Sequence, residues 1–311
     1  MKIVCWCVGA GVFLFLFFAV FPAIGIYIGV FSRKKGISRD GKTAENPQYA
    51  PYAGRYIAGE TFLTALPTRE VSVAAKDGVV LKADYIDGGF PRTAILVPGY
   101  AVVPLYNYSI LGRDLYENGY NLLLVWQRGH GKSGGRVTGM GLLECEDLPL
   151  WVDWVRKETP KNQILLCGTS MGAATVGFAS EALSGQGVSA MVLDCGFASV
   201  QDVMAVECRK RHISTKIELP IMRLVVRLAQ GTDVTRPVAQ SLARTDIPAF
   251  FMHGTADDGV PIEQGYANYA ACASEKECLW VEGAAHAMAY TVGGETAKDR
   301  LFAFLERTMK P

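Results

Sequence analysis

The sequence predicts an α/β fold with a mostly parallel sheet of about eight strands and helices on both faces. Six short apolar runs between residues 93 and 281 alternate with longer segments whose apolar residues recur at helical spacing. Alternating apolar and polar residues around Lys76-Asp77-Gly78 predict a hairpin that adds antiparallel strands at one edge. Around Ser170, in Gly168-Thr169-Ser170-Met171-Gly172, an apolar run meets an Ala-rich segment, which predicts a strand, a sharp turn and a helix.

The composition is that of one large globular domain with an additional apolar element. The chain has 311 residues, of which 50% are hydrophobic, and 31 Lys and Arg nearly balance 30 Asp and Glu. This balance gives no electrostatic reason to expect a nucleic-acid partner. The eight cysteines lack Cys-x-x-Cys spacing, so we interpret most of them as small buried hydrophobic residues and predict no metal site. Cys272 and Cys278 could form a bridge only if the domain were exported.

The amino terminus is predicted to be a single-pass transmembrane anchor. Residues 3–31 carry no charge, and crossing a bilayer takes about 20 apolar residues. A cleaved signal peptide would have a shorter apolar region, and a buried core helix of this length would be unusual at a terminus. Basic residues between Arg33 and Lys42 place the remaining chain in the cytoplasm by the positive-inside rule. We therefore predict an anchor over 1–31, a juxtamembrane tether over 32–69 and the main domain over 70–311.

The predicted strands and helices alternate through the main domain. Short apolar runs predict strands at Thr93–Val97, Asn121–Trp126, Gln163–Cys167, Ala190–Leu193, Pro248–Met252 and Glu277–Val281. Helical spacing predicts helices over Leu105–Asn118, Leu142–Lys157, Met171–Leu183 and Ile262–Ala273. An insertion over about 196–247 contains helical patterns in Val200–Val206 and Ile217–Leu228, which predict a small helical cap.

The loops after the strands carry residues suited to nucleophilic catalysis. A serine hydroxyl becomes a good nucleophile when a histidine takes its proton, and a carboxylate must orient that histidine. Of the histidines at positions 130, 212, 253 and 286, only His286 follows the carboxylates in the order Ser, Asp, His. We therefore predict Ser170 as the nucleophile, His286 as the base and Asp257 as the acid, with Asp258 as the alternative acid.

Two backbone N–H groups are predicted to form an oxyanion hole. Pro98-Gly99-Tyr100 follows a predicted strand, so the N–H of Tyr100 could point at the serine, and the N–H of Met171 would be the second donor. Judged by itself, the Pro98 loop could equally be an ordinary turn at the end of a strand.

A glycine-rich loop at 129–135 resembles a dinucleotide-binding motif but lacks its context. Gly129, Gly131 and Gly134 fit Gly-x-Gly-x-x-Gly, yet further glycines keep the chain irregular until about Leu142, where a helix should already have begun. Trp126 occupies the first glycine position of a Walker A loop. We therefore predict no nucleotide binding, and interpret the segment as a crossover loop braced by Arg128 and His130.

These motifs together resemble the α/β-hydrolase superfamily, and within it the membrane-anchored, BEM46-like and ABHD-type serine hydrolases. The resemblance runs from about Glu70 to the carboxyl terminus. It rests on the motifs at Leu96–Tyr100, Trp126–Ser133, Gly168–Gly172, Asp194–Val200 and His253–Asp257. It implies a nucleophile at Ser170, an acid at Asp257, a base at His286 and backbone donors at Tyr100 and Met171. The sequence departs from the family at Pro98, where histidine is common, and at Gln127, where aspartate is common.

The resemblance implies an esterase-like or lipase-like serine hydrolase that acts through an acyl-enzyme without a metal or organic cofactor. The predicted anchor and the apolar residues of the cap favour an ester or thioester of an acyl, lipid-like substrate. Two alternatives stay open: a serine peptidase of the same fold, and a noncatalytic hydrolase-like binding protein at the membrane.

Overall fold

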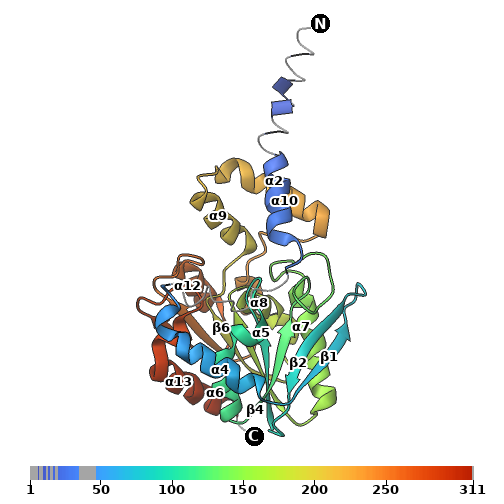
Figure 1. The fold of residues 1–311 in the computed structure, drawn as a ribbon. Coiled ribbons are helices and arrows are strands. Elements are labelled where there is room, and N and C mark those ends of the chain that lie inside the picture. The colour runs from blue at the N-terminus through green and yellow to red at the C-terminus, as the bar shows by residue number, and fades with distance from the viewer. Residues whose placement is uncertain are drawn as a thin grey trace.

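A single twisted sheet forms the centre of the molecule. The computed structural model describes residues 6, 10, 11, 13, 14, 17, 20–34 and 47–309 (Figure 1). Its eight strands lie in the order β1-β2-β4-β3-β5-β6-β7-β8. They are β1 (Thr68–Ala74), β2 (Val80–Ile86), β3 (Arg92–Val97), β4 (Tyr120–Trp126), β5 (Gln163–Thr169), β6 (Val188–Asp194), β7 (Ala249–Gly254) and β8 (Lys276–Val281).

The strand directions confirm the predicted mostly parallel sheet. Strand β2 is antiparallel to both of its neighbours, β1 and β4. The parallel pairs are β4 with β3, β3 with β5, β5 with β6, β6 with β7 and β7 with β8. The turn between β1 and β2 contains Gly78 with φ of 81°, a conformation that glycine adopts without steric cost. Because the six parallel strands point the same way, their carboxyl ends meet at one edge, where the loops that carry the candidate site residues lie.

Helices cover both faces of the sheet. One face packs against α4 (Ala53–Thr64), α6 (Ser109–Glu117) and α13 (Ala289–Thr308), and the other against α7 (Glu144–Glu158), α8 (Met171–Leu183), α11 (Ala239–Leu242) and α12 (Ile262–Ala271). Short helices η2 (Ala50–Tyr52) and α5 (Pro104–Asn107) complete these layers. Helix α13 was not predicted from the sequence. A kink interrupts it at Gly294, whose φ of 55° is not helical and which follows a second glycine, Gly293.

A small cap of helices lies above the carboxyl edge of the sheet (Figure 1). Helices α9 (Val200–Lys210) and α10 (Thr215–Gln230) come from the predicted insertion between β6 and β7. The third helix, α2 (Phe21–Phe31), comes from the amino terminus and contacts α10. The cap is therefore built from two regions that lie far apart in the sequence.

The structure corrects the predicted membrane anchor. Throughout the part of the chain that the structure describes, no helix has both the length and the apolar character needed to cross a bilayer. Helix α2 has 11 residues, and its Ala23 and Phe31 are completely buried within the protein. The predicted membrane localisation is therefore wrong, and the cytoplasmic placement, which rested on the anchor, loses its basis. Within the predicted anchor, residues 1–5, 7–9, 12, 15, 16, 18 and 19 lie outside the described residues.

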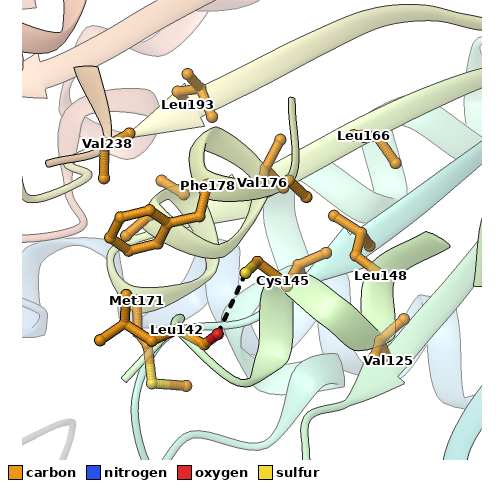
Figure 2. Close-up of a cluster of buried hydrophobic side chains, with 14 of the residues drawn as sticks. Val125, Leu142, Cys145, Leu148, Leu166, Met171, Val176, Phe178, Leu193 and Val238 are labelled. Carbon is orange, nitrogen blue, oxygen red and sulfur yellow. Dashed lines mark hydrogen bonds between the residues drawn. The ribbon is translucent and has the colours of Figure 1, made fainter. Parts of the chain in front are cut away.

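The helix that follows Ser170 is anchored in a dense apolar core. Figure 2 shows side chains from α7, α8 and neighbouring strands in contact, among them Met171 and Phe178 of α8 and Leu148 of α7. These three side chains are at most 2% exposed. Burying a side chain of this size contributes about 1.5–3 kcal/mol, so the position of α8 is strongly determined.

A buried ion pair fixes the glycine-rich loop, in agreement with the predicted bracing role of Arg128. Its guanidinium donates two hydrogen bonds to Asp147, of 2.6 and 2.7 Å, and a third of 2.8 Å to Asp77. The side chains of Arg128 and Asp147 are 9% and 8% exposed. His130, also buried, bonds the Arg128 carbonyl at 2.9 Å through its ring.

We expect Arg128→Ala to lower the free energy of unfolding by about 3–5 kcal/mol, because it leaves the Asp147 carboxylate buried without its partner. Chemical denaturation followed by circular dichroism measures this loss. The control is Lys76→Ala, which removes an exposed ion pair with Glu146 and should cost less than about 1 kcal/mol. Equal effects of the two substitutions would contradict a structural role for the buried pair.

Candidate active site

Ser170 lies at the turn between β5 and α8 in a strained backbone conformation. Its φ of 54° and ψ of −116° are rare for a residue with a side chain, and such strain costs on the order of 1–3 kcal/mol. Its N–H donates to the Asp194 carbonyl at 2.8 Å, and its own carbonyl accepts from Ala174 at 3.0 Å. The strand and the helix on either side therefore hold the turn that presents the hydroxyl.

Two glycines make the predicted turn possible. A Cβ atom at Gly172 would lie 1.9 Å from the Val97 carbonyl oxygen, and one at Gly168 would lie 2.4 Å from the Gly172 carbonyl oxygen. Neither contact could exist with any larger residue, so the close approach of α8 to the sheet requires glycine at both positions.

Ser170, His286 and Asp257 lie together in a continuous hydrogen-bonded chain. The hydroxyl of Ser170 is 2.9 Å from Nε2 of His286, and Nδ1 of His286 is 2.7 Å from Oδ2 of Asp257. With the proton on Nδ1, the imidazole donates to the carboxylate and accepts from the serine. The Asp257 carboxylate is fully buried, whereas the His286 side chain is 31% exposed toward the cavity above it. Such an arrangement can transfer a proton from the serine hydroxyl to the imidazole.

The Asp257 carboxylate is surrounded by hydrogen-bond donors. Its Oδ1 accepts from the backbone N–H groups of Gly259 and Val260 at 2.9 and 2.7 Å. A second histidine, His253, is buried with its Nε2 3.2 Å from Oδ2 of Asp257 and 2.8 Å from the Val260 carbonyl. Burial would raise the pKa of Asp257, but the hydrogen bonds from His253 and His286 hold that pKa well below its usual range. Asp257 is therefore a carboxylate at any physiological pH.

His253 has a defined structural place beside the acid. Burial by itself would lower the pKa of His253, but its hydrogen bonds to Asp257 and Val260 raise the pKa above its ordinary value. The sequence singled out His286 as the base and gave no sign that His253 shares the Asp257 carboxylate with it.

The Pro98–Tyr100 loop lies beside Ser170 and is held by two side chains. A Cβ atom built at Gly99 would be 3.5 Å from Cβ of Ser170. The Gly99 N–H donates to Asn107 at 2.8 Å, and the Gln127 amide donates to the Pro98 carbonyl at 2.6 Å. The backbone N–H of Met171 belongs to the first turn of α8, where donors have no partner within the helix.

A cavity of about 860 Å³ opens above Ser170, between the sheet and the cap. This volume is within the usual range of small-molecule sites, about 300–1,000 Å³. Both predicted oxyanion residues, Tyr100 and Met171, line it together with Ser170 and His286. The cap contributes mainly apolar side chains, including Ile26, Val30, Val200, Val203, Met204 and Met222.

Several residues of the site were missed in the sequence analysis. Gln48 donates to the His286 carbonyl at 2.8 Å, and Tyr49 lines the cavity. Both belong to the predicted tether, and nothing in their local sequence indicates proximity to His286, which is 238 positions away from Gln48. Five residues of α2 between Pro22 and Val30 also line the cavity, although their composition suggested a membrane segment.

The other candidates lie apart from the serine. Asp258 and His212 are exposed, and it is Asp257 that His286 bonds, so the geometry favours Asp257 over the alternative acid. The glycine-rich loop is occupied by the protein itself, because the Arg33 guanidinium donates to the carbonyls of Ser133, Gly135 and Gly131. Of the cysteines that the structure describes, all six have free thiols, including Cys272 and Cys278.

Cys195, Asp257 and His286 have donor atoms within 4.8 Å of one another, the spacing that could hold a metal ion. Both His286 and Asp257 already use these atoms in the hydrogen-bonded chain with Ser170. Burial raises the pKa of the Cys195 thiol far above its ordinary value, which disfavours the thiolate that a metal requires. The donor set therefore suits proton transfer better than metal binding.

The eight-stranded sheet with its strained serine turn defines an α/β-hydrolase fold, and the chain is similar to proteins of the α/β-hydrolase superfamily. Residues 93–224 match the family described as serine aminopeptidase, S33. The esterase Pf2001 of Pyrococcus furiosus superposes with a TM-score of 0.67 at 22% identity, over 90% of this chain and 99% of that chain. The protein YqkD of Bacillus subtilis is 28% identical over 222 residues, 70% of this chain and 72% of its own length.

The fold is also shared with a peptidase. An acylaminoacyl peptidase of Pyrococcus horikoshii superposes with a TM-score of 0.56 at 16% identity, over 80% of this chain and 43% of the peptidase. A likeness at this identity concerns the fold alone. Together the comparisons support a hydrolase and leave its substrate class open.

Asp194 is a second buried carboxyl group near this network. Burial raises the pKa of Asp194 to about 7, and its Oδ1 has no hydrogen-bond partner among the described residues. The folded protein therefore favours protonated Asp194. This contribution to stability is complete below the pKa of about 3.9 that aspartate has in an unfolded chain, and it is lost as pH rises through about 7.

We expect Asp194→Asn to make the protein more stable than the unmutated chain at alkaline pH, by up to about 4 kcal/mol, because asparagine cannot ionise. The advantage should shrink as pH falls from about 7 to about 4. Urea denaturation across this range measures it, with the exposed Asp258→Asn as the control. Parallel pH profiles for the Asp194 variant and the unmutated chain would contradict this account.

Proposed function

We propose that this protein is a serine hydrolase that cleaves an ester or a thioester of an acyl, lipid-like substrate through an acyl-enzyme on Ser170. The observation that carries the proposal is the chain of hydrogen bonds from Ser170 through His286 to Asp257, with lengths of 2.9 and 2.7 Å. This chain ends at the floor of a largely apolar cavity of about 860 Å³. The strained turn at Ser170 supports the same role, since backbone strain often marks a functional residue.

The proposed reaction begins when Oγ of Ser170 attacks the substrate carbonyl carbon and its proton passes to Nε2 of His286. The Asp257 carboxylate stabilises the imidazolium that forms, and the low pKa of this carboxyl keeps it charged. The oxyanion would accept hydrogen bonds from the backbone N–H groups of Tyr100 and Met171. His286 then protonates the departing alkoxide or thiolate, which leaves the acyl group on Ser170, and a water molecule activated by His286 releases the acid.

The lining of the cavity favours an apolar acyl group over a charged one. Among the lining residues that the structure describes, Glu207 is the sole acidic residue, and its carboxylate is 3.4 Å from the Arg211 guanidinium. An aminopeptidase needs a carboxylate to bind the substrate ammonium group, and here that carboxylate already has a basic partner. The serine peptidase is therefore the second candidate, supported by the family match.

We expect Ser170→Ala and His286→Ala each to lower kcat for p-nitrophenyl esters by about 10⁴–10⁶-fold, because the first removes the nucleophile and the second removes its base. Initial rates on the full chain measure the loss, and a fluorophosphonate probe should label the unmutated chain but not Ser170→Ala. A folded unmutated chain that neither reacts with the probe nor hydrolyses any ester would reject the enzyme in favour of a noncatalytic binding protein.

The paired acidic residues provide an internal control for the same measurement. Asp257→Asn should lower kcat by about 10⁴-fold because the histidine loses its orienting partner, whereas Asp258→Asn should leave the rate unchanged. Faster cleavage of aminoacyl p-nitroanilides than of esters by the unmutated chain would favour the peptidase.

A second kinetic prediction concerns Gln127, which holds the Pro98 carbonyl at 2.6 Å and accepts from Thr175 at 3.1 Å. We expect Gln127→Leu to lower kcat by up to about 10²-fold with little change in KM, because the Tyr100 N–H would no longer be held in place. The matched control is Gln186→Leu on an exposed turn. A change in KM with an unchanged kcat would show that Gln127 acts on substrate binding instead.

A further inference from the structure

Helix α2 presents one consistent face to the cavity. Pro22, Gly25, Ile26, Gly29 and Val30 line it at the spacing of a single helical face, and Phe31 at the end of the helix lines it as well. At ~100° per residue, Gly29 and Pro22 lie at the middle of this face and Gly25 at its edge. The other two faces have different surroundings: Ala23 is buried, and Phe21, Ile24 and Ile28 are exposed on the outside.

The two glycines leave space where a side chain would otherwise stand. Among the residues that the structure describes, a Cβ atom built at Gly25 or at Gly29 would meet no other atom within 4 Å. Glycine inside a helix is unfavourable compared with residues that have side chains, so helix stability gives no reason for glycine at these positions. Tight packing against the described part of the chain does not require it either. What the two glycines provide is a wider cavity beside the middle of α2.

The wall formed by α2 is firmly attached to the loops of the active site. The Tyr100 hydroxyl donates to the Val30 carbonyl at 2.7 Å, and the Thr138 N–H donates to the Phe31 carbonyl at 2.8 Å. The Tyr27 hydroxyl lies 3.3 Å from the Gln230 amide of α10. Tyr100 is also the residue whose N–H is the proposed oxyanion donor, so the wall and the reacting centre share a contact.

We infer that α2 forms one wall of an acyl-chain subsite, and that Gly29, with Gly25 beside it, sets the length of the chain that the subsite accepts. This inference rests on the proposed function, because the reacting carbonyl at Ser170 fixes where the acyl chain starts. The occupant that we infer is a flexible, unbranched chain, since aliphatic side chains from α2 and from the rest of the cap line the cavity: Ile26, Val30, Val203 and Met222. Such a chain gains free energy with each methylene group that it buries.

The test compares Gly29→Leu and Gly25→Leu with the unmutated full chain in two assays. The first measures binding of saturated fatty acids, from butanoate to palmitate, by displacement of a fluorescent fatty acid from a Ser170→Ala background. The second measures kcat/KM for p-nitrophenyl esters of the same chains. We expect Gly29→Leu to reduce binding and turnover of the longer chains by about tenfold or more, since one methylene group of misfit is worth about 10–200-fold. The acetate and butanoate esters should be turned over as before.

The matched control is Gly54→Leu. Gly54 is an exposed glycine of α4 that also has open space around it and does not line the cavity. Circular dichroism and thermal unfolding verify that each variant is folded. The inference is overturned if Gly29→Leu changes all chain lengths equally, if it behaves like Gly54→Leu, or if fatty acids do not bind.

The two assays separate this inference from the proposed function. Chain-length-dependent binding that shifts in Gly29→Leu supports the subsite even if no ester is hydrolysed, and in that case only the hydrolase is rejected. Hydrolysis of esters without any shift in Gly29→Leu supports the hydrolase and rejects the subsite.

Discussion

The close approach of the first turn of α8 to the end of β3 is the constraint on which the rest of the site depends. Gly172 faces the Val97 carbonyl oxygen at a distance that leaves no room for a Cβ atom, and Ser170, two residues earlier, has a strained backbone conformation. The strain is offset by the burial of Met171 and Phe178 in the core beneath α8. Apolar packing well below the site therefore determines the position of the serine hydroxyl.

A second constraint is the buried charge of Asp257. A carboxylate taken out of water is costly unless donors replace the water, and here two backbone N–H groups and two histidines do so. The donors come from the same loop, from the end of β7 and from the loop after β8. The pairing of β7 with β8 is therefore needed to keep Asp257 charged and oriented toward His286.

The cap shows how segments distant in the sequence can share one task. Helix α2 reaches the cavity from the amino terminus, and α9 and α10 reach it from the insertion after β6. The loop that carries Arg33 and Lys34 joins α2 to the glycine-rich loop, which Arg128 in turn fixes to Asp147. Access to Ser170 is therefore controlled by elements that depend on the folded domain for their own position.

The sequence by itself determined the sheet, the serine turn and the identity of the three candidate side chains, because hydrophobic periodicity and glycine placement are local properties. It distinguished Asp257 from Asp258 only by preference, whereas in the structure the buried Asp257 lies within hydrogen-bond distance of His286 and Asp258 is exposed. Gln48 and the role of His253 could not be predicted, since their partners are brought to them by the fold. The sequence was misleading at α2, because an uncharged apolar helix has the same kind of composition whether lipid or protein covers it. Tertiary structure decided that question, because burial depends on which surfaces the folded chain places against the helix.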